Sequence, residues 1–270
     1  RRDGIVIKLV QLAPTFDETL DRITSLISPR TRCIAVPHIT CTIGQVLPAK
    51  EIAKLARDKG LWFFLDGAHT PGMMPLDVKE LGCDFFASCG HKWMMGPKGT
   101  GFLYIRKEVQ DIVEPYWTGG SADASWDLVK GTLEYKKDAH KYDFGTQSSS
   151  IYVGLGAAVD FLHHLGMENV ARRGQALALH LRGELEKLGD KIEVLTPEEK
   201  GGYGSVLGFR LKDVPFDKLQ PLLLEKHKII TRMVPENGVN CNRISTHIYN
   251  DFDEVNKVAE AIRLAAEGKG

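Results

Sequence analysis

Apolar runs alternate with amphipathic segments through the first part of the chain, a pattern typical of a mostly parallel sheet covered by helices. The run Leu61–Leu65 is apolar at every position, which predicts a strand buried on both faces. A helix is predicted to begin near Pro48. Residues 114–150 lack a clear period and are predicted to be irregular. The strands expected in this part of the chain cover residues 5–10, 33–36, 61–65, 84–88 and 102–105.

The second part of the chain begins with apolar residues at helical spacing and then changes character. Short strands are expected at residues 192–195 and 205–211, and a helix at 216–227. A last helix should begin at Asp251, because Glu254 follows it at the spacing of a capping box. We therefore predict an α/β fold with residues 1–165 in a large domain and residues 166–270 in a smaller α+β domain.

Composition narrows the class of partner. Lys plus Arg and Asp plus Glu both number 35, so the chain has no basic surplus of the kind that binds nucleic acid or anionic membranes. No run approaches the roughly 18 apolar residues of a membrane span, and no signal stretch opens the chain. We expect a small-molecule substrate and a cytoplasmic location. The five cysteines are odd in number and sparse for this length, which argues against a disulfide scaffold. None of them forms a C-x-x-C pair, which argues against structural zinc.

Two charged residues follow predicted strands. Asp66 comes directly after Leu61–Leu65, at the strand end where open α/β sheets present ligand-binding groups. Taken alone, Asp66 is better explained as an Asp that caps a turn. Lys92 follows the next strand and precedes a loop rich in glycine, residues 96–101. A lysine in such a place can form a Schiff base with a carbonyl compound, and a solvated surface lysine is the alternative.

The combination of these segments resembles a known enzyme family. The sequences from Asp66 to His69, from Gly90 to Trp93 and from Gly96 to Tyr104 are similar to the cofactor core of the class V aminotransferases. This family of fold-type-I enzymes, which use pyridoxal 5′-phosphate (PLP), includes cysteine desulfurases and isopenicillin N epimerase. The local likeness is greatest to the isopenicillin N epimerase-like branch. The resemblance implies that roughly an N-terminal third of the family's full chain, with the loop that supplies most phosphate contacts, is missing.

The resemblance implies a role for each residue that matches the motifs. Lys92 would carry PLP as a Schiff base, and Asp66 would pair with the pyridine nitrogen. This pairing keeps the ring protonated, so that it can accept electrons from the substrate. His69 would lie near the phenolic oxygen of the ring. Ser88 and His91 would contact the phosphate, although Cys89 stands where a stronger donor is usual.

Two further matches lie toward the C-terminus. Thr146 resembles a residue that reaches the phosphate of the neighbouring subunit's cofactor, which implies a homodimer with shared active sites. Arg243 resembles the arginine that binds the substrate α-carboxylate, a task suited to the forked guanidinium group. Cys241 would share a strand face with Arg243, so a reactive role stays open beside that of a buried thiol.

Several functions remain compatible with these residues. The first is a PLP-dependent aminotransferase or epimerase of α-amino acids, and the alternative is a carbon–sulfur lyase of the cysteine desulfurase kind. A third is an inactive fragment that lacks the phosphate-binding loop. A metal hydrolase that uses His38, Asp66, His69 and His91 is disfavoured, because these residues lack the paired helical spacing of metal ligands.

Overall fold

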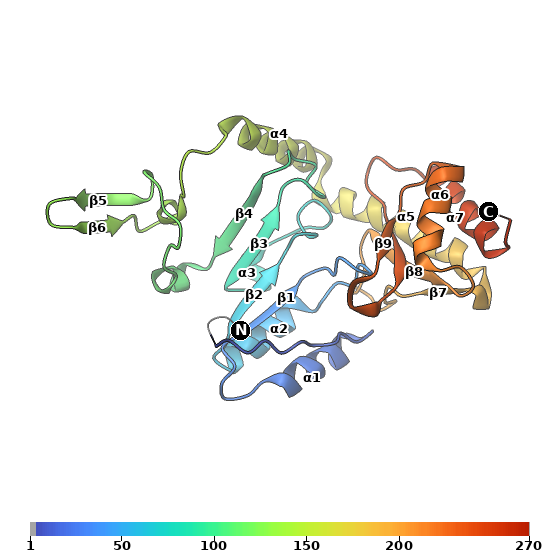
Figure 1. The fold of residues 1–270 in the computed structure, drawn as a ribbon, viewed down its shortest axis with the longest axis horizontal. Helices are drawn as coiled ribbons and strands as arrows, with labels where there is room; N and C mark the ends of the chain where they lie inside the picture. The colour runs from blue at the N-terminus through green and yellow to red at the C-terminus, as the bar shows by residue number, and fades with distance from the viewer. Residues whose placement is uncertain (1–3, 270) are drawn as a thin grey trace.

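Two four-stranded sheets organise the chain in a computed structural model that describes residues 4–269 (Figure 1). The first sheet has the strand order β1-β2-β3-β4, in which β1, β2 and β3 run parallel and β4 runs antiparallel to β3. The sheet is therefore mostly parallel, as predicted. Its strands are β1 (Cys33–Pro37), β2 (Trp62–Asp66), β3 (Phe85–Cys89) and β4 (Gly101–Ile105).

Helices cover one face of this first sheet. They are α1 (Phe16–Leu26), α2 (Ala49–Asp58) and the short α3 (Val78–Leu81). Ile52 of α2 packs with Phe63 and Leu65 of β2 in one apolar core. The prediction that β2 is buried on both faces is wrong, because Trp62, on the opposite face, is 39% exposed. Alternation along the strand explains the difference, since only every second side chain points to the helices.

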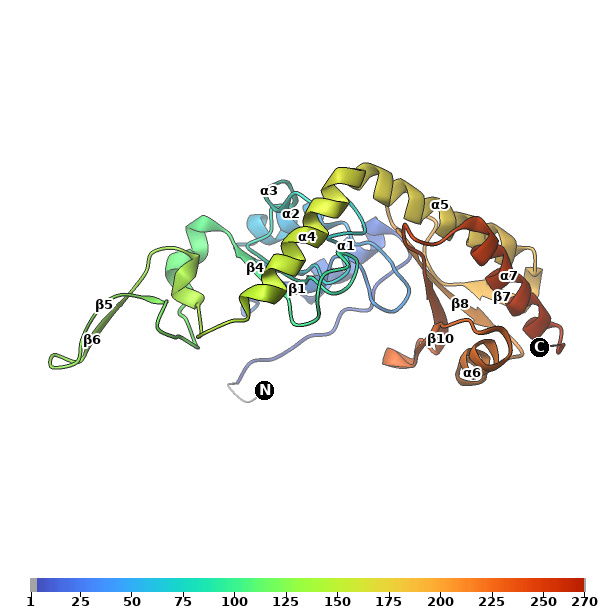
Figure 2. The same cartoon turned by 90° about the horizontal axis from the view of Figure 1, so that it is seen from above.

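The second sheet is antiparallel and has the order β7-β8-β10-β9. It packs with α5 in a separate core that includes Leu181, Phe209 and Ile262. Figure 2 shows α4 leading into α5, which lies across this sheet. We propose residue 165 as the boundary between two domains, since Gly166 has φ +82 and separates α4 from α5. The elements of this part are α4 (Ser149–Leu165), α5 (Met167–Glu186), β7 (Ile192–Val194), β8 (Val206–Leu211), α6 (Phe216–His227), β9 (Arg232–Val234), β10 (Cys241–Ser245) and α7 (Phe252–Ala266).

Local signals account for the helix ends that were predicted and for one that was missed. Asp251 and Glu254 form the capping box at the start of α7, which confirms the prediction. Helix α1 was not predicted, although the Thr15 side chain caps it by accepting a hydrogen bond from the Glu18 backbone N–H. The pair of Thr15 and Glu18 was a readable start signal.

Two other expectations were wrong. Residues 5–10 form no strand, because no neighbouring strand pairs with them, and Ile5 and Leu9 are exposed. The stretch 114–150 is not wholly irregular: β5 (Asp123–Asp127) and β6 (Thr132–Tyr135) form an antiparallel hairpin that extends away from both sheets (Figure 1). A 3-10 turn at Lys107–Ile112 lies just before this stretch, and another at Ala139–Tyr142 lies within it. Shorter 3-10 turns occur at Gly189–Lys191 and Glu236–Gly238.

Candidate functional site

His69 and Lys92 meet beyond the ends of β2 and β3. The Lys92 amine Nζ lies 3.5 Å from His69 Nε2, and the Trp93 indole N–H donates a hydrogen bond of 2.9 Å to His69 Nδ1. Burial lowers the pKa of His69 to about 3, with further contributions from the positive charges of Lys92, Arg243 and Arg232. The imidazole is therefore neutral at physiological pH.

The loop that carries Lys92 is held closed by its own backbone. Gly90 donates to the Thr100 carbonyl at 2.9 Å, and the N–H of Gly96 donates to the Gly90 carbonyl at 2.8 Å. Within the loop Met95 has φ +59, a conformation that non-glycine residues adopt only where surrounding structure maintains it. The loop thus returns the chain from β3 to β4 and presents Lys92 at the sheet edge.

Arg243 approaches the same place from the second sheet. It lies on β10 opposite Arg232 of β9, and both guanidinium groups donate to the Cys41 carbonyl oxygen. Burial lowers the pKa of Arg243, and the charge of Arg232 adds to this effect. Its Nε atom is buried and has no hydrogen-bond partner among residues 4–269. A buried unpaired N–H group is costly, so this edge of the guanidinium is suited to an anionic ligand.

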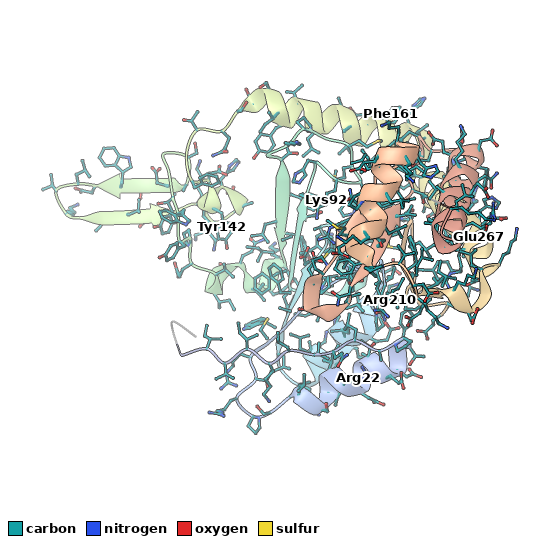
Figure 3. All side chains as sticks on the ribbon, turned by 45° about the vertical axis from the view of Figure 1, so that its right-hand side comes forward. Arg22, Lys92, Tyr142, Phe161, Arg210 and Glu267 are labelled. Atoms are coloured by element: carbon teal, nitrogen blue, oxygen red, sulfur yellow. The ribbon has the colours of Figure 1, made fainter. Side chains whose placement is uncertain are left out.

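These side chains line one cavity of about 480 Å³ between the two sheets. Figure 3 shows Lys92 between the first sheet and the C-terminal elements. Among residues 4–269 the lining includes three cationic side chains and no carboxylate, which favours an anionic ligand. The lining residues are Cys41, His69, Lys92, Trp93, Arg232, Arg243, Ser245, His247 and Tyr249. A larger cavity of about 730 Å³ among α5, α6 and α7 contains none of the predicted site residues.

Asp66 lies at the end of β2 beside this cavity but does not belong to its lining. In the sheet register it pairs with Ala87 of β3, five residues before Lys92. Its carboxylate is exposed and accepts a hydrogen bond of 2.9 Å from the Ala68 backbone N–H. The turn that follows β2 therefore fixes the side chain without consuming both carboxylate oxygens.

The three residues predicted to contact phosphate do not gather in the cavity. The Ser88 hydroxyl donates to the Gly67 carbonyl at 2.9 Å, so its proton is already used within the chain. His91 is exposed on the loop beside Lys92. Thr146 is exposed in the segment that precedes α4. The Cys89 thiol points to the Ala68 carbonyl, 3.7 Å away.

Two other residues considered in the sequence occupy the interior. Cys241 is 0% exposed, and burial raises the pKa of its thiol to about 11, so it is a structural residue of β10. His38 accepts or donates a hydrogen bond with Thr70 at 3.0 Å, and burial lowers its pKa to about 4. Within the described part of the chain, no three His, Cys, Asp or Glu side chains are arranged to hold a metal ion. Among residues 4–269 no helix is both long and apolar enough to cross a membrane.

Several lining residues were not identified as site residues from the sequence. Trp93 and His247 were noted only as neighbours of Lys92 and Arg243, and that adjacency was the available signal. Arg232 and Cys41 carried no signal at all, because they reach the cavity only when the second sheet packs against the first.

Comparison with known proteins agrees with this arrangement. A cysteine desulfurase of Haloferax volcanii is 32% identical over 277 residues, which cover 99% of this chain and 63% of that protein. Isopenicillin N epimerase of Amycolatopsis lactamdurans is 28% identical over 278 residues, covering 97% of this chain and 68% of the epimerase. A solved structure of a C-DES variant, with glycine covalently linked to its PLP cofactor, has a TM-score of 0.80 and 25% identity. That alignment covers 91% of this chain and 63% of the C-DES chain.

The matches cover nearly all of this chain but only part of the length of its relatives. The chain spans about 63% of the length of the Haloferax volcanii relative. A family model described as "Aminotransferase class-V" matches residues 1–258, which is nearly the whole chain. The fold, the adjacent Asp66 and Lys92 segments and this match agree, and the chain belongs to the class-V aminotransferase family.

Proposed function

We propose that this chain is part of an enzyme that uses PLP to transform an α-amino acid, by aminotransfer or epimerisation. One observation carries the proposal: Lys92 and Arg243, whose Nε–H is buried and unpaired, line the same cavity. An amino-acid substrate needs both groups. The guanidinium group of Arg243 can bind its carboxylate, and the amine of Lys92 can take the proton from Cα.

The residues around Lys92 fit PLP. The Lys92 amine is available for covalent attachment, His69 lies beside it, and the exposed Asp66 carboxylate stands at the neighbouring strand end. When bound, PLP withdraws electrons from the substrate Cα. We propose His91 as a contact of its phosphate, and Ser88 as a second contact for which its hydroxyl must release the Gly67 carbonyl. We propose Thr146 as a contact to the phosphate in a second subunit of a homodimer. The exposed position of Thr146 supports that assignment.

Arg243 and Lys92 have different proposed roles toward the substrate. Arg243 donates one Nη1–H to the Cys41 carbonyl, so the edge that carries Nε remains for the substrate carboxylate. The pairing of Arg243 with the substrate carboxylate fixes the Cα substituents relative to Lys92. This orientation lowers the entropic cost of reaching the reactive geometry. The Lys92 amine would remove the Cα proton. Epimerisation then requires that a proton reach the opposite face of Cα, and aminotransfer requires that it reach another atom.

We predict that Arg243→Lys selectively weakens binding of amino acids. The substitution keeps the charge but removes the fork, and one lost charge-assisted hydrogen bond costs about 1.5–3 kcal/mol. The KM for an amino acid should therefore rise by roughly 10-fold to 150-fold. Steady-state kinetics with an amino acid, and with the corresponding amine that lacks the carboxylate, measure the effect.

Arg210→Lys is the matched control, because Arg210 lies on the adjacent strand β8 and pairs with Glu193 outside the cavity. That variant should behave like the wild type with both compounds. Equal weakening of amino acid and amine by Arg243→Lys would show that Arg243 is structural and would remove the main support for an α-amino acid substrate.

Carbon–sulfur bond cleavage is a second candidate function, favoured by the position of Cys41. This cysteine is exposed and lines the cavity, and its carbonyl oxygen is held by Arg232 and Arg243. In such a reaction the Cys41 thiolate bonds to the sulfur of a cysteine substrate while the Cβ–S bond breaks. The electron pair of that bond passes to the substrate carbon, and its protonation yields alanine and a persulfide on Cys41.

For this second function we expect Cys41→Ser to abolish sulfur transfer from cysteine. Mass spectrometry of the peptide that contains Cys41, after incubation with cysteine and before any reductant, should show one added sulfur atom in the wild type. Cys33→Ser is the control, since Cys33 is also exposed but lies outside the cavity. Unmodified Cys41 in a preparation that still acts on another amino acid would exclude the second function and leave the first in place.

A further inference from the structure

The hydrogen bond between Trp93 and His69 determines where the His69 proton lies. An indole nitrogen can only donate, so His69 Nδ1, 2.9 Å away, must be the acceptor. The neutral imidazole therefore carries its proton on Nε2. Both side chains are about 7% exposed, so water does not compete effectively for this bond.

The proton on Nε2 faces the cavity. Nε2 is the ring atom that lies 3.5 Å from the Lys92 amine, and His69 is part of the cavity lining. In this tautomer His69 presents a donor beside Lys92, whereas the other tautomer would present a lone pair. A donor there suits an oxygen that carries negative charge, such as a phenolate on a molecule attached to Lys92.

The indole that directs this proton is held from both sheets. Trp93 packs in a cluster with Met73 of the first part and Val206 of β8. Its carbonyl oxygen accepts a hydrogen bond of 3.0 Å from His247 Nε2, and the two rings stack at 5.5 Å and 16°. Gly72, with φ +85, lies so close that an added Cβ would be 2.3 Å from the Trp93 carbonyl oxygen. The backbone of Trp93 is thus clamped between two segments.

We infer that Trp93 is a positioning residue whose indole N–H holds His69 in the Nε2–H tautomer, so that His69 donates a hydrogen bond to the group bound at Lys92. The inference deepens the proposed function and depends on it for the identity of that group, the phenolic oxygen of PLP. The link through His247 also connects this donor to the strand segment that carries Arg243. His69 acts on the bound group, and Trp93 acts only through His69.

Nitrogen-15 NMR of histidine-labelled protein without PLP tests the tautomer directly. In the wild type, His69 should show a protonated Nε2 and a bare Nδ1, unchanged between about pH 8 and pH 5 because its pKa lies near 3. Trp93→Phe keeps an aromatic ring to stack on His247 but removes the N–H, and should give a mixture of both tautomers. A wild-type Nδ1–H form, or the same single tautomer in Trp93→Phe, overturns the inference. If Trp93→Phe fails to fold, the wild-type spectrum alone decides.

A double-variant cycle tests the consequence in the PLP-loaded enzyme. Trp93→Phe should lower kcat by about 10-fold, the effect of one hydrogen bond, while the KM for the amino acid stays within about 2-fold. In a His69→Gln background the amide can donate without any tautomer choice, so Trp93→Phe should have no further effect on kcat. An equal loss of kcat on Trp93→Phe in the wild type and in the His69→Gln variant would mean that Trp93 acts through packing. That result overturns the inference. If PLP does not bind at all, the proposed function fails while the NMR result still stands or falls separately.

Discussion

Lys92→Ala should abolish both covalent attachment of PLP and turnover. The Lys92 amine is the only lysine side chain in the cavity lining, and it is the group that we propose to remove the Cα proton. Loss of a group that acts both as attachment point and as base is expected to reduce kcat by at least about 10⁴-fold. The visible absorption band of the PLP-loaded protein should disappear, and borohydride reduction followed by peptide mapping should label the Lys92 peptide in the wild type only.

Lys98→Ala provides the matched control, because Lys98 is exposed on the same glycine-rich loop and does not line the cavity. This variant should keep the absorption band and turnover. Residual wild-type turnover in Lys92→Ala would contradict the assignment. A wild-type chain that never develops the band would instead support the alternative that this chain lacks what it needs to retain PLP.

Asp66→Asn should leave PLP attached but reduce turnover by roughly 100-fold or more, equivalent to about 2.7 kcal/mol or more. The amide can still accept the hydrogen bond from the Ala68 N–H, so the turn after β2 should persist. It cannot keep a pyridine nitrogen protonated, and the electron sink depends on that proton. The measurement is kcat alongside the absorption spectrum, with Asp66→Ala as a second variant.

Asp213→Asn is a suitable control for charge removal, since Asp213 is exposed in the small part of the chain and outside the cavity. It should leave kcat unchanged. If Asp66→Asn turns over at the wild-type rate, Asp66 only caps the turn and has no contact with the cofactor ring. If instead the variant loses the absorption band altogether, Asp66 contributes chiefly to PLP binding.

The local signals in the sequence were sufficient for most elements of the first sheet. Strands β1 to β4 occur where apolar runs predicted them, and Asp66 and Lys92 follow strands as expected. The prediction at residues 5–10 was wrong because an apolar run does not itself supply a partner strand. Hairpin β5–β6 was missed because its apolar residues, such as Trp126 and Val129, are exposed and so follow no core-facing pattern.

The sequence by itself determined which candidate residues lie at one edge of the first sheet. Asp66, His69 and Lys92 follow adjacent strands of a parallel sheet, and parallel strand ends meet at one edge. Residues close to these motifs, including Trp93, were within reach of the same reasoning. The capping box at Asp251 shows equally that a local interaction can be read from the chain alone.

Only the tertiary structure decided how the other half of the site is assembled. Arg243 lies 202 residues from the Cys41 carbonyl that it contacts, and His247 lies 154 residues from Trp93. Such pairs depend on how the two sheets pack. That packing follows from the complementary shapes of buried side chains, which the spacing of residues in the sequence does not encode. For the same reason the tautomer of His69 was unreadable: a proton position depends on the partner that each ring nitrogen meets in the folded chain.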